Sequence, residues 1–239
     1  MSILSSKKEN YWVSLSDIMT VLMVIFMFIA ITYMRQIKKD QENQNRVLEE
    51  YQETYIALFD TLNSEFEEDF KESNWHAELS EDLSIRFLNE EVLFDYNSVE
   101  LKPEFQQILE DFFPRYLEIL LDKQFRDKIA EVRIEGHTDS KGGYMFNVRL
   151  SQNRTSNVLD FLFNRRGSEY LDMEVIDREL LRYWFTTTGF SYGRTMDRNG
   201  ELTIESNNSE NSARSRRVEF RIVMKSEEVL KQMLEMMNE

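Results

Sequence analysis

A single carboxylate, Asp17, interrupts an apolar stretch of 24 residues (11–34) that carries no other charged side chain. A charge at the centre of a membrane-spanning helix costs roughly 2.5–3.5 kcal/mol, so such a residue usually faces a protein interior or a water-filled path. A carboxylate in that setting can exchange a proton or bind a small cation. The alternative is structural: Asp17 follows Trp12 by only five positions, and an Asp at the start of the helix could act as a cap exposed to headgroup water.

The composition excludes several other kinds of chemistry. The chain has no cysteine and two histidines, which removes disulfides, thiolate zinc sites and cysteine nucleophiles and argues against a zinc-dependent hydrolase. Glu135 and Asp139 resemble the carboxylate pair of a glycosidase, but no other feature supports that reaction. The net charge of -15 lies entirely in residues 35–239, because the four charges of residues 1–34 cancel. Such an acidic portion disfavours nucleic acid as a partner. We therefore predict a protein that is not an enzyme and has no metal site.

The element that must position Asp17 is a membrane-spanning helix. Twenty-four helical residues rise about 36 Å, which exceeds a hydrocarbon layer of about 30 Å. Tyr11, Trp12 and Tyr33 lie at the two ends of the stretch, where interfacial aromatic residues are typical. No A-x-A site follows it, which disfavours a cleaved signal peptide. We predict a cytoplasmic tail at 1–10 and a transmembrane helix at 11–34.

The next segment, residues 35–80, is polar and contains neither proline nor glycine, so we predict a helical linker. Apolar side chains recur along it at steps of three and four residues and form one helical face: Leu48, Tyr51, Tyr55, Leu58, Leu62, Phe66 and Phe70. This stripe favours a parallel coiled coil between two copies. The alternative is that the helix packs on its own domain.

Residues 81–239 have the pattern of an α+β domain with a mixed sheet and helices on one sheet face. We predict short strands or a hairpin at 83–87 and 92–96, and a helix that begins at Pro103 and is kinked or split by Pro114. Further strands are predicted at 129–134, 183–190 and 218–223, with a helix at 146–164 and a mobile loop at 196–213. A final helix is predicted at 226–237, capped by Ser226.

The segment around Asp17 resembles the spanning helix of the MotB family of stator subunits. In that family an Asp followed by x-Met-Thr-x-x-Met carries the ion in a channel formed with a MotA-type partner. Asp17, Met19, Thr20 and Met23 fall on that pattern. The resemblance implies that Asp17 is the ion carrier and that no cofactor is bound. We expect the ion to be H⁺ rather than Na⁺.

Three separated blocks resemble the peptidoglycan-binding signature of the OmpA-like family, and together they cover about residues 83–224. The main block has Gly-His-Thr-Asp at 136–139, followed by Asn147, Leu-Ser at 150–151 and Arg154. The block before it is Val-Leu-Phe-Asp-Tyr at 92–96 with Leu-Lys-Pro at 101–103. The closing block, 215–220, has Ser215 where the family usually has Asn.

The resemblance implies that the domain binds the diaminopimelate stem of peptidoglycan. Asp139 would pair with the ammonium of the stem, and Arg154 would hold its carboxylate with a fork of donors. Thr138, Asn147 and Arg217 would supply hydrogen bonds around them. Taken singly, Asp139 could be a turn residue and Arg154 a surface arginine.

Two signals conflict over the orientation in the membrane. Lys7 and Lys8 precede the apolar stretch, whereas four basic residues follow it between positions 35 and 46, so the charge rule places the C-terminus in the cytoplasm. A wall-binding domain can act only outside the inner membrane. Since three blocks support that domain, we predict a single-pass protein of the bacterial inner membrane with a cytoplasmic N-terminus and a periplasmic domain.

The Trp-Val-Ser-Leu-Ser-Asp entry at 12–17, the acidic C-terminal part and the short connector are similar to the ZorB family, the MotB-like subunits of Zorya anti-phage defence systems. This resemblance implies a homodimer inside a pentamer of the MotA-like ZorA. The ion-driven motor would signal phage invasion to cytoplasmic effectors, without direct contact of this subunit with nucleic acid. A flagellar MotB-type stator subunit and a structural membrane-to-wall anchor remain as alternative functions.

Overall fold

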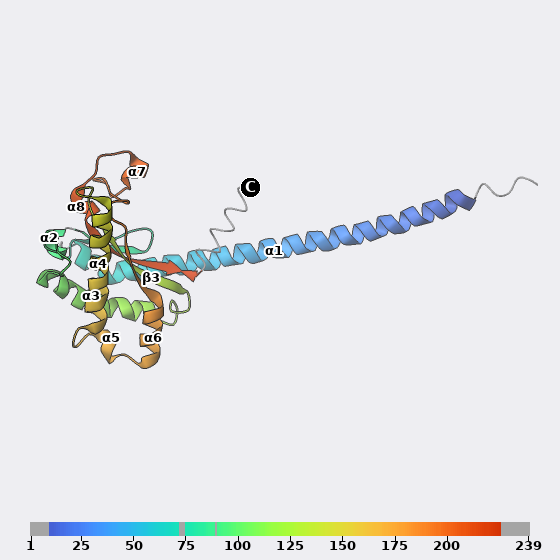
Figure 1. Ribbon diagram of the computed structural model, residues 1–239. Helices are drawn as coiled ribbons and strands as arrows, with labels where there is room; N and C mark the ends of the chain where they lie inside the picture. The colour runs from blue at the N-terminus through green and yellow to red at the C-terminus, as the bar shows by residue number, and fades with distance from the viewer. Residues whose placement is uncertain (1–9, 72–74, 89, 226–239) are drawn as a thin grey trace, which may run out of the picture. The chain divides into compact units, whose positions relative to one another are not determined.

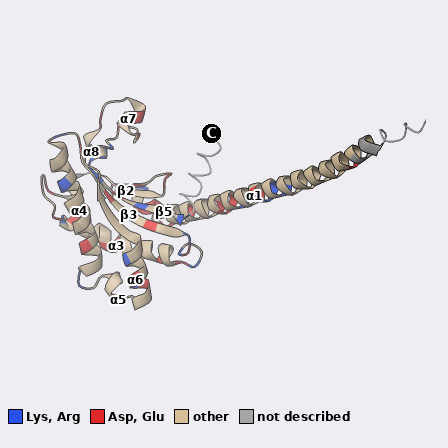
Figure 2. Ribbon diagram, turned by 45° about the vertical axis from the view of Figure 1, so that its right-hand side comes forward, with Lys and Arg blue, Asp and Glu red and all other residues tan. Residues whose placement is uncertain are grey.

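The computed structural model describes residues 10–71, 75–88 and 90–225. Its first element is α1 (Asn10–Lys71), a helix that contains neither Pro nor Gly (Figure 1). The helix is long and apolar enough to span a membrane, and its most apolar window of 18 residues has a mean hydropathy of 2.3 and no buried residue. Beyond the apolar stretch, charged side chains resume at Arg35. Figure 2 shows Lys and Arg in blue and Asp and Glu in red along α1. The predicted apolar helix is confirmed.

The C-terminal part of α1, from Tyr51 on, belongs to the same compact unit as the following domain. Leu58, Leu62 and Phe66 are at most 1% exposed and lie in the core of that unit. These three side chains of the stripe therefore pack against the chain's own domain. Leu48 is exposed, and the pairing of two copies stays a prediction.

The linker helix is shorter than predicted, because α1 ends at Lys71 and residues 77–79 form a strand. Trp75 and Ala77 are buried in the core, so the chain turns into the domain before residue 80. The core therefore begins well before the predicted domain boundary at residue 81.

Five strands form one mixed sheet in the order β1-β2-β5-β3-β4. Their bounds are Ala77–Leu79 (β1), Ser84–Phe87 (β2), Ile129–His137 (β3), Phe185–Gly189 (β4) and Arg217–Met224 (β5). All neighbouring pairs are antiparallel except β3 and β4, which are parallel. The mixed sheet is as predicted, with strands close to the predicted ranges 83–87, 129–134, 183–190 and 218–223.

The two faces of the sheet differ because successive side chains of a strand point to opposite faces. In β5, Val218, Phe220 and Ile222 are buried in the apolar core, whereas Arg217 and Glu219 belong to a buried polar network. Helices cover the apolar face. Phe112, in α3 (Pro103–Leu121), lies 5.1 Å from the Phe220 ring and 5.2 Å from the Phe87 ring, measured between centroids. The apolar face and its helices hold the core.

Helix α4 (Tyr144–Asn164) approaches the same sheet face closely enough to require glycine. A Cβ on Gly136 would lie 2.7 Å from the carbonyl oxygen of Ser151, and a Cβ on Gly189 would lie 2.4 Å from the backbone nitrogen of Gln152. These two strand glycines let the N-terminal half of α4 pack directly on β3 and β4, which fixes α4 next to the end of β3.

Several predicted elements differ from the structure. Residues 92–96 are not a strand: α2 (Glu90–Leu93) precedes Phe94, which makes a single bridge to Leu101. Pro114 does not split α3. Two helices after α4 were not predicted, α5 (Glu169–Asp172) and α6 (Val175–Trp184). The predicted loop at 196–213 includes α7 (Thr203–Ser206), and α8 (Ser212–Ser215) begins within it. The predicted final helix, 226–237, lies outside the described residues.

Candidate functional site

Asp17 lies on α1 with its side chain exposed. Thr20 is one helical turn later on the same face, and its hydroxyl donates a hydrogen bond to the carbonyl oxygen of Ser16 at 2.9 Å. The apolar side chains around Asp17, such as Ile18 and Met19, are also exposed, at 62% and 61%. The chain therefore presents a carboxylate on an uncovered apolar surface, where lipid alone could not solvate it.

Thr138 and Asp139 follow directly after β3 and are held in place by backbone bonds. The Thr138 N–H donates to the carbonyl oxygen of Ser191 at 2.9 Å, and Asp139 Oδ1 accepts from the N–H of Lys141 at 3.2 Å. The turn continues through Gly142, whose φ of +92° favours glycine. Both side chains are buried, at 3% and 6% exposed. The end of β3 therefore fixes the backbone of Thr138 and the carboxylate of Asp139.

Two buried side-chain oxygens at this turn lack hydrogen-bond partners within the described part of the chain. Thr138 Oγ1 and Asp139 Oδ2 have none, although Asp139 Oδ2 lies 3.6 Å from Arg216 Nη1 and 4.0 Å from Lys141 Nζ. Buried polar atoms in native proteins are normally satisfied by protein, water or a ligand. Two such oxygens on neighbouring residues mark this turn as a candidate binding site for a hydrogen-bond donor.

Asn147 has a supporting role in this arrangement. It is buried in the first turns of α4, and its Nδ2 donates to the carbonyl oxygen of Lys141 at 2.8 Å. That bond ties α4 to the turn carrying Asp139. We expected Asn147 to supply a hydrogen bond to the ligand; in the structure its Nδ2 bonds to the turn, and a contact with a ligand stays a prediction.

Arg154 is buried in α4, at 4% exposed, and holds the segment before α3. Its Nε donates to the carbonyl oxygen of Ser98 at 2.8 Å, and its Nη2 donates to that of Asp95 at 3.4 Å. The guanidinium carbon also lies 4.6 Å from the centroid of the Phe94 ring. The cavity lined by Phe94, Arg154 and Arg216 has a volume of only about 10 Å³. To hold a ligand carboxylate, Arg154 would have to exchange some of these contacts.

Arg217 does not bond to the residues around Asp139. It lies on the polar face of the sheet, where Nε donates to Glu219 Oε1 and Nη1 donates to the carbonyl oxygens of Arg194 (3.1 Å) and Ser215 (3.2 Å). The neighbouring Arg216 supplies the cation beside Asp139 instead. We expected Arg217 to supply a hydrogen bond around Asp139 and Arg154, and we did not single out Arg216. The alternation of side chains along a strand, applied to the Arg-Arg pair, could have separated the two.

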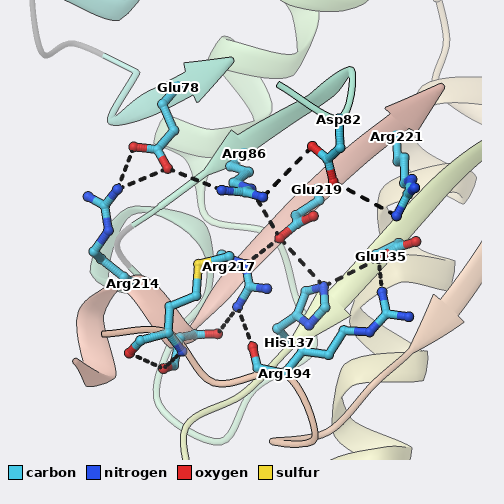
Figure 3. A network of polar contacts seen from close by, with 12 residues as sticks. Glu78, Asp82, Arg86, Glu135, His137, Arg194, Arg214, Arg217, Glu219 and Arg221 are labelled. Carbon is cyan, nitrogen blue, oxygen red and sulfur yellow. Dashed lines mark hydrogen bonds and ion pairs between the residues drawn. The ribbon is translucent and has the colours of Figure 1, made fainter. Parts of the chain in front are cut away.

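The polar face of the sheet carries a network of ion pairs (Figure 3). Arg214 contacts both oxygens of Glu78, at 3.0 and 2.7 Å. Arg86 Nε lies 3.5 Å from Glu219 Oε1, and Arg194 Nη1 lies 3.1 Å from Glu135 Oε2. The network joins β1, β2, β3 and β5 to the segment that follows β4, so its main effect is on the fold around the site.

His137 lies at the centre of this network and is 2% exposed. Its Nε2 is 3.6 Å from Glu135 Oε2 and 3.8 Å from Glu219 Oε1. Burial, together with the positive charge of Arg217, lowers the pKa of His137 to about 3. Burial raises the pKa of Glu135.

These three side chains have the composition of a metal site, with ligand atoms within 4.8 Å of one another. However, Glu135 already accepts from Arg194 and Glu219 from Arg217. The guanidinium groups therefore provide the cations that these carboxylates need, and the geometry favours an ion-pair network over a bound metal.

An exposed apolar surface adjoins the turn that carries Asp139, and we did not predict it. Tyr144, Met145 and Phe146 begin α4 and are 50%, 59% and 51% exposed. The Tyr144 ring packs edge-on against Tyr192, with centroids 5.3 Å apart. The Tyr-Met-Phe run directly after Gly142 and Gly143 was the signal for it. This surface could pack against apolar parts of a ligand held at Asp139.

Comparisons with known proteins find related sequences over most of the chain. The OmpA family model matches residues 93–211. The Zorya protein ZorB of Escherichia coli, Crooks strain, is 34% identical over 228 residues, which cover 92% of this chain and 90% of that protein. A second Zorya protein ZorB, from Escherichia coli O139:H28, is 25% identical over 90% of this chain and 80% of its own length. Among solved structures, a MotB-like protein from Desulfovibrio vulgaris is 22% identical, with 73% of this chain and 98% of that chain covered and a TM-score of 0.46.

Proposed function

Because the chain belongs to the ZorB family, we propose that it is the ion-carrying, wall-anchored stator subunit of a membrane motor in anti-phage defence. The observation that carries the proposal is the presence, on one chain, of a carboxylate in an apolar helix and an OmpA-like domain with unsatisfied buried oxygens at Thr138 and Asp139. A stator needs both parts, because a moving ion can produce torque only against a fixed point. We assign no catalytic step to the chain.

The surroundings of Asp17 support a partner in the membrane. Its side chain and its apolar neighbours are exposed on α1, and an uncovered carboxylate is costly in lipid. A ring of MotA-like ZorA subunits would cover this surface and provide a hydrated path. Each ion that binds or leaves Asp17 would change the charge of the helix, and that change would drive the ring. We propose two copies of this chain within a pentameric ring, with H⁺ as the ion.

The turn after β3 supports anchoring to peptidoglycan. Asp139 Oδ2 has an unused acceptor capacity and a buried position, as expected of a group that receives the ammonium of a diaminopimelate stem. In this proposal Arg216, 3.6 Å from that oxygen, and Arg154 pair with the carboxylate of the diaminopimelate residue. In this proposal Thr138 adds a hydrogen bond, while Asn147 keeps the turn in place. The domain would lie in the periplasm and the N-terminus in the cytoplasm.

The motor function is tested by replacing Asp17 with Asn in the full-length chain, produced with its ring partner and effectors. We expect protection against phage to be lost, because an amide cannot exchange the ion. Asp40→Asn is the matched control: it lies on the same helix outside the apolar stretch and accepts a bond from Gln36 Nε2 at 3.0 Å. Undiminished protection by Asp17→Asn would leave only the structural-anchor function.

A gene deletion in cells that carry the whole system distinguishes the defence function from a flagellar one. The relationship to ZorB over nearly the whole chain supports defence. We expect deletion of the gene to remove phage protection and to leave swimming motility unchanged. Lost motility with intact protection would assign the chain to a flagellar motor instead.

A further inference from the structure

Ser191 follows the end of β4 by two residues and has a backbone conformation that is unusual for serine. Its φ of +55° lies in the left-handed region, which residues with a Cβ adopt only at a cost in free energy. The residue is 0% exposed, so contacts within the domain hold it in this conformation. Strained residues persist where the surrounding structure fixes them, and they cluster at functional sites. The contacts of Ser191 therefore indicate its role.

The hydrogen-bonding groups of Ser191 hold both ends of the turn that carries Asp139. Before the turn, its carbonyl oxygen accepts from the Thr138 N–H at 2.9 Å. After the turn, its hydroxyl donates to the carbonyl oxygen of Tyr144, the first residue of α4, at 3.0 Å. Only residues 139–143 separate these two points in the chain. One buried residue thus fixes the separation between the end of β3 and the start of α4.

A third bond fixes Ser191 itself against α4. Its N–H donates to Ser151 Oγ at 3.1 Å, and that hydroxyl in turn donates to the carbonyl oxygen of Asn147 at 2.8 Å. The chain then turns, with a bond of 3.1 Å from the Gly193 N–H to the carbonyl oxygen of Phe190. The N–H, the carbonyl and the side chain of Ser191 are therefore all bonded, and these bonds offset the cost of the left-handed backbone.

The candidate binding site depends on an ordered turn. The unsatisfied oxygens of Thr138 and Asp139 bind a ligand with little loss of free energy only if the backbone that carries them is already ordered, because ordering on binding reduces affinity. Asn147 holds the middle of the turn through the carbonyl oxygen of Lys141, whereas Ser191 holds its two ends. Ser191 is too deeply buried to touch a ligand, so its effect on binding is indirect.

We propose that Ser191 is a positioning residue of the wall-binding site, which acts through Thr138 and Tyr144. The proposal rests on the proposed function of the Asp139 turn in binding peptidoglycan. The hydroxyl is the part of this arrangement that a substitution removes, because the other two bonds come from the backbone. Glycine adopts a positive φ without strain and alanine does not, but both lack the hydroxyl. These two substitutions therefore separate loss of the hydroxyl from backbone strain.

The first measurement is titration of the full-length protein in detergent with a soluble stem peptide that contains diaminopimelate. We expect the affinity of Ser191→Gly and of Ser191→Ala to fall equally, by about 2- to 10-fold, the change in equilibrium constant that one neutral hydrogen bond carries. Ser168→Ala is the matched control, because Ser168 is also buried, at 5% exposed, but directly precedes α5. We expect this control to bind the peptide as the unmodified protein does.

The second measurement is hydrogen exchange of the same proteins without peptide, followed by mass spectrometry. The backbone amides of residues 138–146 should exchange several-fold faster in both Ser191 variants and at an unchanged rate in Ser168→Ala. Unchanged exchange in this range would overturn the proposal. Faster exchange throughout the domain would also overturn it, because that result would show a general loss of stability.

The two measurements distinguish failure of this proposal from failure of the proposed function. If the unmodified protein binds the peptide and both Ser191 variants bind it equally well, Ser191 has no positioning role and the proposed function stands. A loss of affinity confined to Ser191→Ala would assign the effect to backbone strain and would also overturn the proposal. If the unmodified protein does not bind the peptide, the proposed function is wrong, and the exchange rates still decide whether Ser191 holds the turn.

Discussion

Replacing Asp139 with Asn tests the wall-binding site with little disturbance of the fold. The amide retains an oxygen that can accept from the Lys141 N–H, the bond that now holds Oδ1 at 3.2 Å. It loses the negative charge at Oδ2, whose residue is buried. A hydrogen bond to a charged group contributes about 1.5–3 kcal/mol. We therefore expect the affinity for a diaminopimelate-containing stem peptide to fall about 10- to 150-fold.

The assay is titration of the full-length protein in detergent with a soluble stem peptide, supported by co-sedimentation with isolated sacculi. Asp172→Asn is the matched control, because this residue lies on α5 and is exposed. A second peptide, acetylated at the diaminopimelate ammonium, completes a double-mutant cycle. Acetylation should weaken binding to the unmodified protein and have little further effect on Asp139→Asn. Equal losses for both proteins would refute the pairing of Asp139 with the ammonium, even if the variant binds weakly.

The remaining predictions concern the framework of the site. Arg154→Ala should destabilise the domain by about 2–4 kcal/mol, because it removes charged donors from the carbonyl oxygens of Ser98 and Asp95; chemical denaturation measures this, with the exposed Arg149→Ala of the same helix as control. Gly136→Ala should lower the free energy of unfolding by about 1–3 kcal/mol, because the new Cβ would lie 2.7 Å from the Ser151 carbonyl oxygen. A variant as stable as the unmodified protein would disprove the close packing of α4. Burial lowers the pKa of His137 from 6.5 to about 3, so the unfolded state alone takes up its proton as the pH falls below about 6.5. Stability should then decrease by up to about 1.4 kcal/mol per pH unit, and His137→Gln should remove this part of the pH dependence; identical slopes would contradict it.

The elements with strong periodicity could be predicted from the sequence, because local side-chain patterns determine them. The apolar helix around Asp17, the alternating strand at 218–223 and the helix carrying Arg154 all lie close to their predicted ranges. Residues 92–96 have the composition of a strand, but the structure gives a short helix followed by one bridge. Tertiary contacts determine the conformation of this segment, because the Phe94 ring packs against the Arg154 guanidinium.

The sequence predicts which residues form the site, but it predicts only part of the contacts between them. The positions of Thr138 and Asp139 after a strand follow from the local sequence. The roles of Arg216 and Arg217 depend on which face of the sheet each side chain reaches, and that in turn depends on the register of β5 against β3. Registers are set by partners far apart in the chain, here about 80 residues, so a motif alone could not assign these two arginines.

The burial of Leu58, Leu62 and Phe66 has a practical consequence for anyone who wishes to exchange or isolate the wall-binding module. A fragment that begins at residue 81, where the family signature suggests a boundary, would leave Phe112 without its neighbour Phe66 at 5.3 Å and without Trp75 at 6.1 Å. It would expose apolar surface and tend to aggregate. A chimera should therefore be joined within α1 ahead of Tyr51. The transferred module then includes the C-terminal part of α1, whose side chains belong to the domain core.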